Sequence, residues 1–173
     1  MDSCRKENLL IVGMGQYGFL AREIAWAMNC FDRIDFLDDN HPDAVGKMED
    51  LARLSEQYDC AVVAIGNPEI RKSCMEKLDD LYQLVSLIHP MSYISPSACV
   101  GRGCIIEPLA VIHTQTLIAD GCLISAGAVI NHNSKLGVCC HIDCNGTVPA
   151  RAELAAYTKV SAGQVYGNSD QQE

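Results

Sequence analysis

The chain has 173 residues and a formal net charge of -9 at pH 7, and its sequence pI is about 4.9. No cluster of lysine and arginine offsets the acidic residues, which argues against nucleic acid and anionic membranes as partners. The length leaves room for one domain, or for two small domains that share an interface.

The cysteines and the apolar segments indicate a reduced, cytoplasmic protein. Ten cysteines are spread along the chain without a CxxC pair, so we expect ten free thiols rather than a disulfide scaffold. The apolar run Leu9–Met14 is too short to cross a bilayer, and we expect neither a signal peptide nor a transmembrane segment.

The first 90 residues alternate predicted strands and helices. Strands are expected at Leu9–Val12, Ile34–Leu37, Cys60–Gly66 and Leu84–Ile88, and helices from the glycine-rich segment to Asn29, at Lys47–Gln57 and at Asn67–Leu81. This alternation favours a parallel sheet with right-handed crossovers.

A glycine-rich loop joins the first strand to the first helix. Gly13, Gly15 and Gly18 lie where a nucleotide fingerprint would, and Asp38 and Asp39 follow about 20 to 25 residues later. Glycines let the backbone approach a phosphate, although a tight structural turn would use them as well. The strand–helix context and the two acids favour a nucleotide, and the small domain suits a mononucleotide or a nucleotide-linked sugar better than a dinucleotide.

The second half of the chain is a hexad repeat. Every sixth residue is a branched aliphatic, and the residue four places later is small in all but the last hexad. The anchors are Ile94, Val100, Ile106, Ile112, Ile118, Ile124, Ile130, Leu136, Ile142, Val148, Leu154 and Val160. Each hexad predicts one short strand and one tight corner, so three hexads make a triangular coil of 18 residues. The sequence therefore predicts a parallel β-helix of about four coils.

Three small-position cysteines are spaced by one predicted coil. Cys104, Cys122 and Cys140 should stack one above another on a single side of the prism. A metal or redox seam is one interpretation, and a column of small apolar side chains is the other. We expect the second, and no bound metal.

The hexads, with His132 inside the segment Gly127–Asn133, resemble the hexapeptide-repeat acyltransferases. More narrowly, they are similar to the sugar O- and N-acetyltransferases of the bacterial sialic-acid and bacillosamine pathways. The resemblance implies a Rossmann-like nucleotide-sugar-binding domain at residues 1–90 and a left-handed β-helix at residues 91–173. It also implies a homotrimer with active sites between neighbouring subunits, and acetyl-CoA as the co-substrate.

The same resemblance assigns roles to individual residues. It implies that His132 is the general base and that Asn133 stands where relatives often have an acid that holds the imidazole. The implied contacts to the nucleotide and sugar are Gly13, Gly15, Tyr17, Asp38, Asp39, Gly66 and Ser125, and those to coenzyme A are His141 and Ala162. Tyr17 replaces a histidine often found in the family.

The implied chemistry is acyl transfer from a thioester to an amine or hydroxyl. Such transfer needs a base for the acceptor's proton and donors that stabilise the oxyanion, and histidine suits the first role. No covalent enzyme intermediate is implied. The resemblance thus predicts an acetyl-CoA-dependent acetyltransferase acting on a nucleotide-linked (UDP) amino sugar in bacterial surface-glycan biosynthesis.

Two other functions stay open at the sequence level. Relatives continue for another coil and a closing loop, whereas this sequence ends at Glu173 after four coils. With Asn133 and Tyr17, this also fits a nucleotide-sugar-binding protein with a degenerate acyltransferase scaffold. The other alternative is an acyltransferase for a different small acceptor, with a purely structural N-terminal domain.

Overall fold

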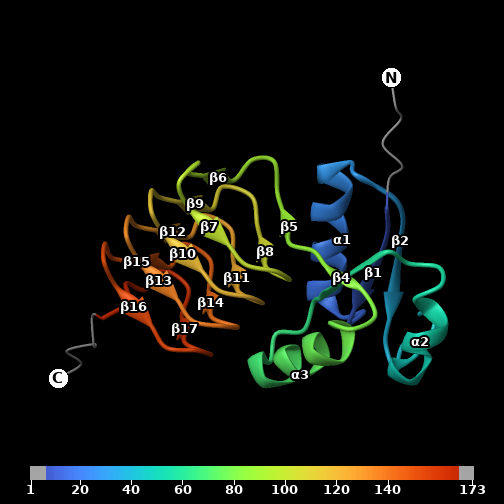
Figure 1. The fold of residues 1–173 in the computed structure, drawn as a ribbon. Helices are drawn as coiled ribbons and strands as arrows, with labels where there is room; N and C mark the ends of the chain where they lie inside the picture. Colours follow the sequence, from blue (N-terminus) through green and yellow to red (C-terminus); the bar gives the residue numbers. More distant parts are fainter. Residues whose placement is uncertain (1–6, 168–173) are drawn as a thin grey trace.

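A computed structural model describes residues 7–167 of the chain. It contains an α/β unit and a β-helix that lie side by side (Figure 1), as predicted. Among the described residues, no helix combines the length and the apolar character that a membrane span needs.

The α/β unit is built on a parallel sheet with the strand order β2-β1-β3-β4. Its elements are β1 (Glu7–Val12), α1 (Gln16–Met28), β2 (Phe31–Leu37), β3 (Cys60–Val63), α3 (Pro68–Leu78) and β4 (Gln83–Leu84). Side chains alternate across the central strand, so Leu9 and Ile11 pack with α1 while Leu10 and Val12 pack with α3. This confirms the predicted alternation of strands and helices.

Two predicted elements differ from the structure. The helix expected at Lys47–Gln57 is a 3-10 turn, η1 (Met48–Asp50), followed by a single α-helical turn, α2 (Leu51–Leu54). Asp50 accepts a hydrogen bond from the Lys47 N–H at 2.9 Å, which tightens the first turn, and the Ser55 hydroxyl bonds back to the Ala52 carbonyl at 2.8 Å, as serine often does where helices end.

The strand expected at Leu84–Ile88 is divided between two sheets. Leu84 pairs with β3 in the α/β unit, whereas Leu87 and Ile88 form β5, which pairs with β8 of the β-helix. The β-helix thus begins ahead of residue 90, and the division of the chain into domains at that residue stays a prediction.

Within the described residues, thirteen two-residue strands follow one another every six residues. They are β5 (Leu87–Ile88), β6 (Tyr93–Ile94), β7 (Cys99–Val100), β8 (Ile105–Ile106), β9 (Val111–Ile112), β10 (Leu117–Ile118), β11 (Leu123–Ile124), β12 (Val129–Ile130), β13 (Lys135–Leu136), β14 (His141–Ile142), β15 (Thr147–Val148), β16 (Glu153–Leu154) and β17 (Lys159–Val160). Every third strand pairs in parallel, so that Ile124 lies beside Ile106 and Ile142. The 18-residue coil is confirmed.

Three sheets form the sides of the prism, and we name them by their first strands. They are the β5 sheet (β5-β8-β11-β14-β17), the β6 sheet (β6-β9-β12-β15) and the β7 sheet (β7-β10-β13-β16). The predicted anchors point inward and pack in one core.

The small residues of the hexads tie neighbouring coils together at the corners. The thiols of Cys104, Cys122 and Cys140 each donate to a backbone carbonyl 15 residues later, at 3.3, 3.2 and 3.1 Å. The hydroxyls of Thr116 and Ser134 make the same bond. These cysteines are therefore fully buried packing residues that also serve as weak donors.

Cysteine chemistry adds nothing further in the described part of the chain. Free thiols in the described range include Cys60, Cys74, Cys99, Cys104, Cys122, Cys139, Cys140 and Cys144, and Cys4 lies outside the described residues. Within the same range, no group of three or more His, Cys, Asp and Glu side chains could hold a metal ion.

The α/β unit covers the outer face of the β5 sheet. Leu87, Ile105 and Leu123 are the outward residues of its first three strands, and all three are 0% exposed because they pack in the cluster that contains α1. His141 and Lys159 occupy the next two outward positions. His141 is only half-buried, so it lies where the cover by the α/β unit ends.

Candidate functional site

A small cavity lies at the carboxyl ends of β1, β2 and β3. The chain passes from β1 to β2 on one side and later to β3 on the other, and such a switch point is where parallel α/β sheets bind ligands. The cavity has a volume of about 170 Å³ and is lined by Val12, Gly13, Leu37, Asp38, Asp39, Asn40, Met48, Ile65, Ile70 and Cys74. It contains three of the residues predicted to bind the nucleotide.

The glycines of this region serve two different purposes. Gly13 has a φ of +103°, and a Cβ on Gly18 would lie 2.1 Å from the Gly13 carbonyl oxygen, so the fold itself requires both. A Cβ on Gly15 or on Gly66 would meet nothing within 4 Å. Gly15 is also the N-cap of α1 and provides no side-chain cap. The backbone at Gly15 and Gly66 is therefore open to a ligand, next to unpaired N–H groups of the helix.

Asp38 organises the loop next to the cavity. Its carboxylate accepts hydrogen bonds from the backbone N–H groups of Met14 at 2.8 Å, Asn40 at 2.9 Å and His41 at 3.2 Å. These bonds, that from Met14 first, hold the pKa of Asp38 below its ordinary value. The neighbouring Asp39 accepts from the Met48 N–H at 2.8 Å and remains exposed.

A second group of polar residues joins α1 to the β-helix. The Tyr17 hydroxyl donates to Glu107 at 3.3 Å, and Glu107 also accepts from the Ala126 N–H at 3.1 Å. Burial, together with the Glu107 carboxylate, raises the pKa of Tyr17 well above its ordinary value, so Tyr17 stays protonated and acts as a donor. The sequence analysis missed Glu107, although it lies one coil before Ser125.

Ser125 and His141 are in contact on the same side of the prism. The Ser125 hydroxyl lies 3.2 Å from Nε2 of His141. Burial lowers the pKa of His141, so its imidazole is neutral at neutral pH. Ala162 lies two coils above Ala126, at an exposed position of the same corner.

Arg71 connects the cavity loop to the β-helix, and the sequence analysis missed it. This side chain is 0% exposed. Its guanidinium donates to the carbonyls of Gly121 (2.8 Å), Ile65 (2.6 Å), Gly66 (3.0 Å) and Cys139 (2.9 Å). No salt bridge to Arg71 is present within residues 7–167. Its helical spacing with Cys74, Met75 and Leu78 could have marked it as an inward-facing cation.

His132 lies at a different corner of the prism. We call residues 107–110, 125–128, 143–146 and 161–164, which follow the β5 sheet, the cleft corner, and residues 95–98, 113–116, 131–134 and 149–152, which follow the β6 sheet, the histidine corner. Nδ1 of His132 lies 2.9 Å from the Asn133 side-chain oxygen. Because that oxygen can only accept, Nδ1 is the donor of this bond, which leaves Nε2 as the nitrogen that could act as a base.

The structure thus brings the predicted residues together in two groups. Gly13, Asp38 and Asp39 line the small cavity, with Gly66 on the loop beside it, while Tyr17, Ser125 and His141 gather around Glu107 and the cleft corner. His132 and Asn133 lie at the histidine corner of the same chain and belong to neither group.

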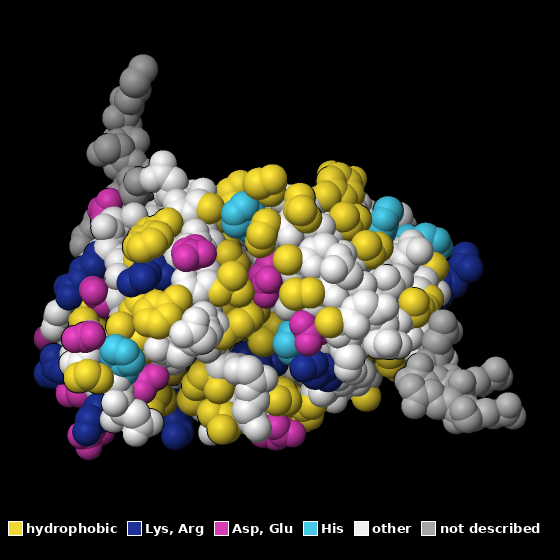
Figure 2. Space-filling model, turned by 180° about the vertical axis from the view of Figure 1, so that it is seen from behind, with side chains coloured by type: hydrophobic (Ala, Val, Ile, Leu, Met, Phe, Trp, Pro, Cys, Tyr) yellow, Lys and Arg dark blue, Asp and Glu magenta, His cyan; other side chains and the backbone are white. Residues whose placement is uncertain are grey.

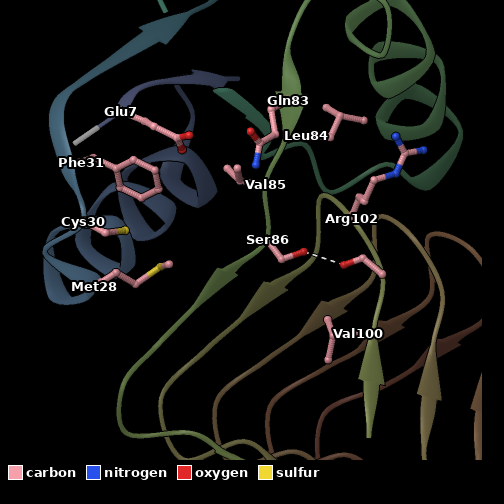
Figure 3. A pocket seen from close by; sticks show the side chains of 11 residues that line it. Glu7, Met28, Cys30, Phe31, Gln83, Leu84, Val85, Ser86, Val100 and Arg102 are labelled. Atoms are coloured by element: carbon pink, nitrogen blue, oxygen red, sulfur yellow. Dashed lines mark hydrogen bonds between the residues drawn. The ribbon is translucent and has the colours of Figure 1, made fainter. Parts of the chain in front are cut away.

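A larger cavity lies elsewhere in the described part of the chain. Its volume is about 720 Å³, and it is lined by Glu7, Phe31 and Gln83, which begin β1, β2 and β4, and by residues near the first coil (Figure 3). There the Ser86 hydroxyl donates to the Gly101 carbonyl at 2.7 Å. This cavity lies at the amino ends of the strands and contains none of the predicted site residues, so its size does not mark the site.

The protein thus consists of two parts. An α/β unit, with a glycine-rich loop and a cavity at the switch point of its sheet, packs on a β-helix that has a histidine at one corner. Residues 8–78 match the family model described as the PglD N-terminal domain. A "UDP-N-acetylbacillosamine N-acetyltransferase" of Bacillus subtilis (strain 168) is 32% identical over 114 residues, which cover 58% of this chain and 51% of the relative. The match therefore spans about half the length of this curated relative.

Solved structures extend the likeness over both units. The acetyltransferase domain of PglB from Neisseria gonorrhoeae FA1090 is 28% identical, with a TM-score of 0.79 over 92% of this chain and 91% of that one. PerB from Caulobacter crescentus, solved with CoA and GDP-perosamine, is 23% identical and shares the fold, with a TM-score of 0.68 over 91% of this chain and 87% of that one. The α/β unit thus matches the PglD N-terminal domain family, and the chain as a whole is similar to sugar acetyltransferases with a left-handed β-helix.

Proposed function

We propose that the protein is an acetyl-CoA-dependent acetyltransferase that acts on a nucleotide-linked (UDP) amino sugar in bacterial surface-glycan biosynthesis. The observation that carries the proposal is His132, whose Nδ1 is bonded to Asn133 while Nε2 is free to take a proton. The relatives support it, because one is named as an N-acetyltransferase of a UDP-linked sugar and the PglB domain has been solved with acetyl coenzyme A.

The proposed reaction is a direct transfer. Nε2 of His132 removes a proton from the acceptor's amino group as the nitrogen attacks the thioester carbonyl. A carbon–nitrogen bond forms, the carbon–sulfur bond breaks, and coenzyme A leaves as its thiol after taking up a proton. Backbone N–H groups stabilise the oxyanion of the tetrahedral intermediate.

The other residues divide between the two substrates. Gly13, Gly15 and Gly66 let the nucleotide approach the backbone, and Asp38 and Asp39 lie beside it. Tyr17 and Ser125 lie at the sugar and its acceptor group. His141 and Ala162 lie along the cleft corner, where coenzyme A would bind.

A homotrimer would complete the site. The outward residues of the β6 sheet begin with Tyr93, which is 56% exposed, and continue with the half-buried Val111 and Val129. Figure 2 shows hydrophobic side chains along the upper part of the β-helix. A second copy packed on this apolar sheet would cover it and would place its cleft corner beside the neighbouring His132. The site would then lie between two subunits of a cytoplasmic enzyme with no nucleic-acid or membrane partner.

Asn133 favours a second candidate function. An amide orients the imidazole but provides no charge to stabilise imidazolium, which fits a nucleotide-sugar-binding protein that no longer transfers the acetyl group. In that case, UDP-sugars would bind without releasing coenzyme A.

A thiol-release assay distinguishes the two functions. The full chain is mixed with acetyl-CoA and a panel of UDP- and GDP-linked amino sugars, and free coenzyme A is measured over time, while binding of each sugar is measured by calorimetry. Release that depends on a UDP-amino sugar is the expected result, together with a trimer by light scattering. Sugar binding without release would support the second function, and a monomer would contradict the intersubunit site.

A further inference from the structure

Gln115 lies directly beside Asn133, one coil earlier on the histidine corner. The two positions are 18 residues apart, and the Asn133 amide nitrogen donates to the Gln115 side-chain oxygen at 2.6 Å. Both side chains are exposed in the single chain. The Gln115 backbone N–H is bonded to the Ser97 hydroxyl at 3.2 Å, which anchors the residue on the first coil of the corner.

The orientation of the Asn133 amide decides which nitrogen of His132 is the base. If the amide oxygen faces the imidazole, Nδ1 carries the hydrogen and Nε2 can accept a proton. If the amide is turned by 180°, its NH₂ group donates to Nδ1, and Nε2 then carries the hydrogen and is no base. A carboxylate has no such ambiguity, because both of its oxygens accept.

We propose that Gln115 is a positioning residue that selects the base-competent tautomer of His132. By accepting from the Asn133 nitrogen, its oxygen directs the Asn133 oxygen toward Nδ1. This inference rests on the proposed function, and it gives the amide pair the orienting role that a single acid would otherwise have.

The test uses two substitutions at position 115 that keep the length of the side chain but differ in their ability to accept a hydrogen bond. Gln115→Glu places two acceptors there, so it should keep the Nδ1–H tautomer and the wild-type kcat. Gln115→Met keeps the length but cannot accept, so it should mix the tautomers and lower kcat about five-fold, the scale of one net hydrogen bond, with KM unchanged. Gln83→Met, in β4 of the α/β unit, is the matched control and should change neither quantity.

The Asn133→Asp background separates orientation from general disruption of the corner. With a carboxylate at position 133 there is no orientation to select, so adding Gln115→Met should change kcat less than two-fold relative to Asn133→Asp alone. The same five-fold loss in both backgrounds would show that Gln115 acts in another way and would overturn the proposal.

Nitrogen-15 NMR of the histidine side chains tests the effect of Gln115 on the His132 tautomer and does not depend on enzymatic activity. The full chain should show the Nδ1–H tautomer at His132, assigned with His132→Ala, and Gln115→Met should shift its two ring-nitrogen signals toward each other. An unchanged tautomer in Gln115→Met would overturn the proposal even if the enzyme is active. Conversely, failure of acetyl transfer in every variant would contradict the proposed function while this measurement still decides the role of Gln115.

Discussion

The cleft corner and the histidine corner have the same backbone but different surroundings. In both, neighbouring coils pair in an 18-residue register, and the small residues of the central coils are buried, namely Ala110 and Ala128 at the first corner and Thr116 and Ser134 at the second. At the cleft corner, the α/β unit removes water from Glu107 and Ser125, which are 6% and 3% exposed. At the histidine corner, Gln115 and Asn133 face solvent. A repeat thus provides equivalent positions, and the element packed on each position decides its chemistry.

Under the proposed function, one chain holds two incomplete halves of a site. The cleft corner and the α/β unit packed on it have the buried polar groups and the small cavity, and the histidine corner has the proposed base. Substitutions at the histidine corner should therefore mainly lower activity, whereas substitutions on the cleft side should mainly lower stability.

Replacing His132, the proposed base, should have the largest effect. His132→Ala is expected to lower kcat by about 10² to 10⁴, the usual contribution of acid–base catalysis, with little change in stability because the side chain is only half-buried. Steady-state thiol release measures the change. His113→Ala, one coil earlier on the same corner, is the control, and its kcat should stay close to that of the wild type. A His132→Ala variant with wild-type kcat would contradict the assignment of His132 as the base.

Arg71 should control stability on the cleft side. Arg71→Met would leave four carbonyls without their guanidinium donor, and we expect a loss of about 3 kcal/mol in the free energy of unfolding. Urea unfolding followed by circular dichroism measures it. Arg53→Met is the control, since its exposed ion pair with Asp50 should contribute little to the free energy of unfolding. Equal effects of the two substitutions would contradict the role of Arg71 as a link between the units.

Replacing Asp38 should have a smaller effect on the free energy of unfolding, and this effect should depend on pH. Its pKa is lowered in the folded state, so its stabilisation is complete above the ordinary carboxyl pKa of about 4 and is lost as the pH falls through the lower folded value. The free energy of unfolding of the wild type should exceed that of Asp38→Asn by about 1 kcal/mol at pH 6. This difference in stability should shrink as the pH falls toward 3. Asp39→Asn removes the same charge but leaves the three bonds to Asp38 intact. A difference that grows on acidification would contradict the assigned bonds.

Periodicity made the β-helix predictable in detail. A six-residue spacing with alternating large and small positions leaves few possible structures, so the anchors and the stacked cysteines were found from the sequence. The α/β elements followed from strand–helix alternation, with errors where local bonds decide the outcome, as at Asp50 and Ser55. The division of Leu84–Ile88 was missed because an apolar run fits equally well in either sheet.

Residues of the candidate site could be proposed from the sequence only where a motif marks them. The glycine loop and His132 stand out in the sequence, and the structure gives Gly15 and Gly66 an open surround that the sequence does not reveal. Glu107, Arg71 and Gln115 were missed because each acts through a contact across 18 or more residues, namely with Ala126, Gly121 and Asn133. Such contacts depend on the register of the coils and on the packing of the two units.

Subunit complementation tests the division of the site most directly. His132→Ala removes the base, and Gly15→Asp places a negative charge where a phosphate would approach α1 while keeping a good N-cap residue. Co-expressed and purified as mixed oligomers, the two inactive chains should recover about a quarter of the wild-type kcat, because random assembly joins an intact α/β unit to an intact histidine corner at one interface in four. Mixed oligomers as inactive as their parents would contradict a site shared between subunits.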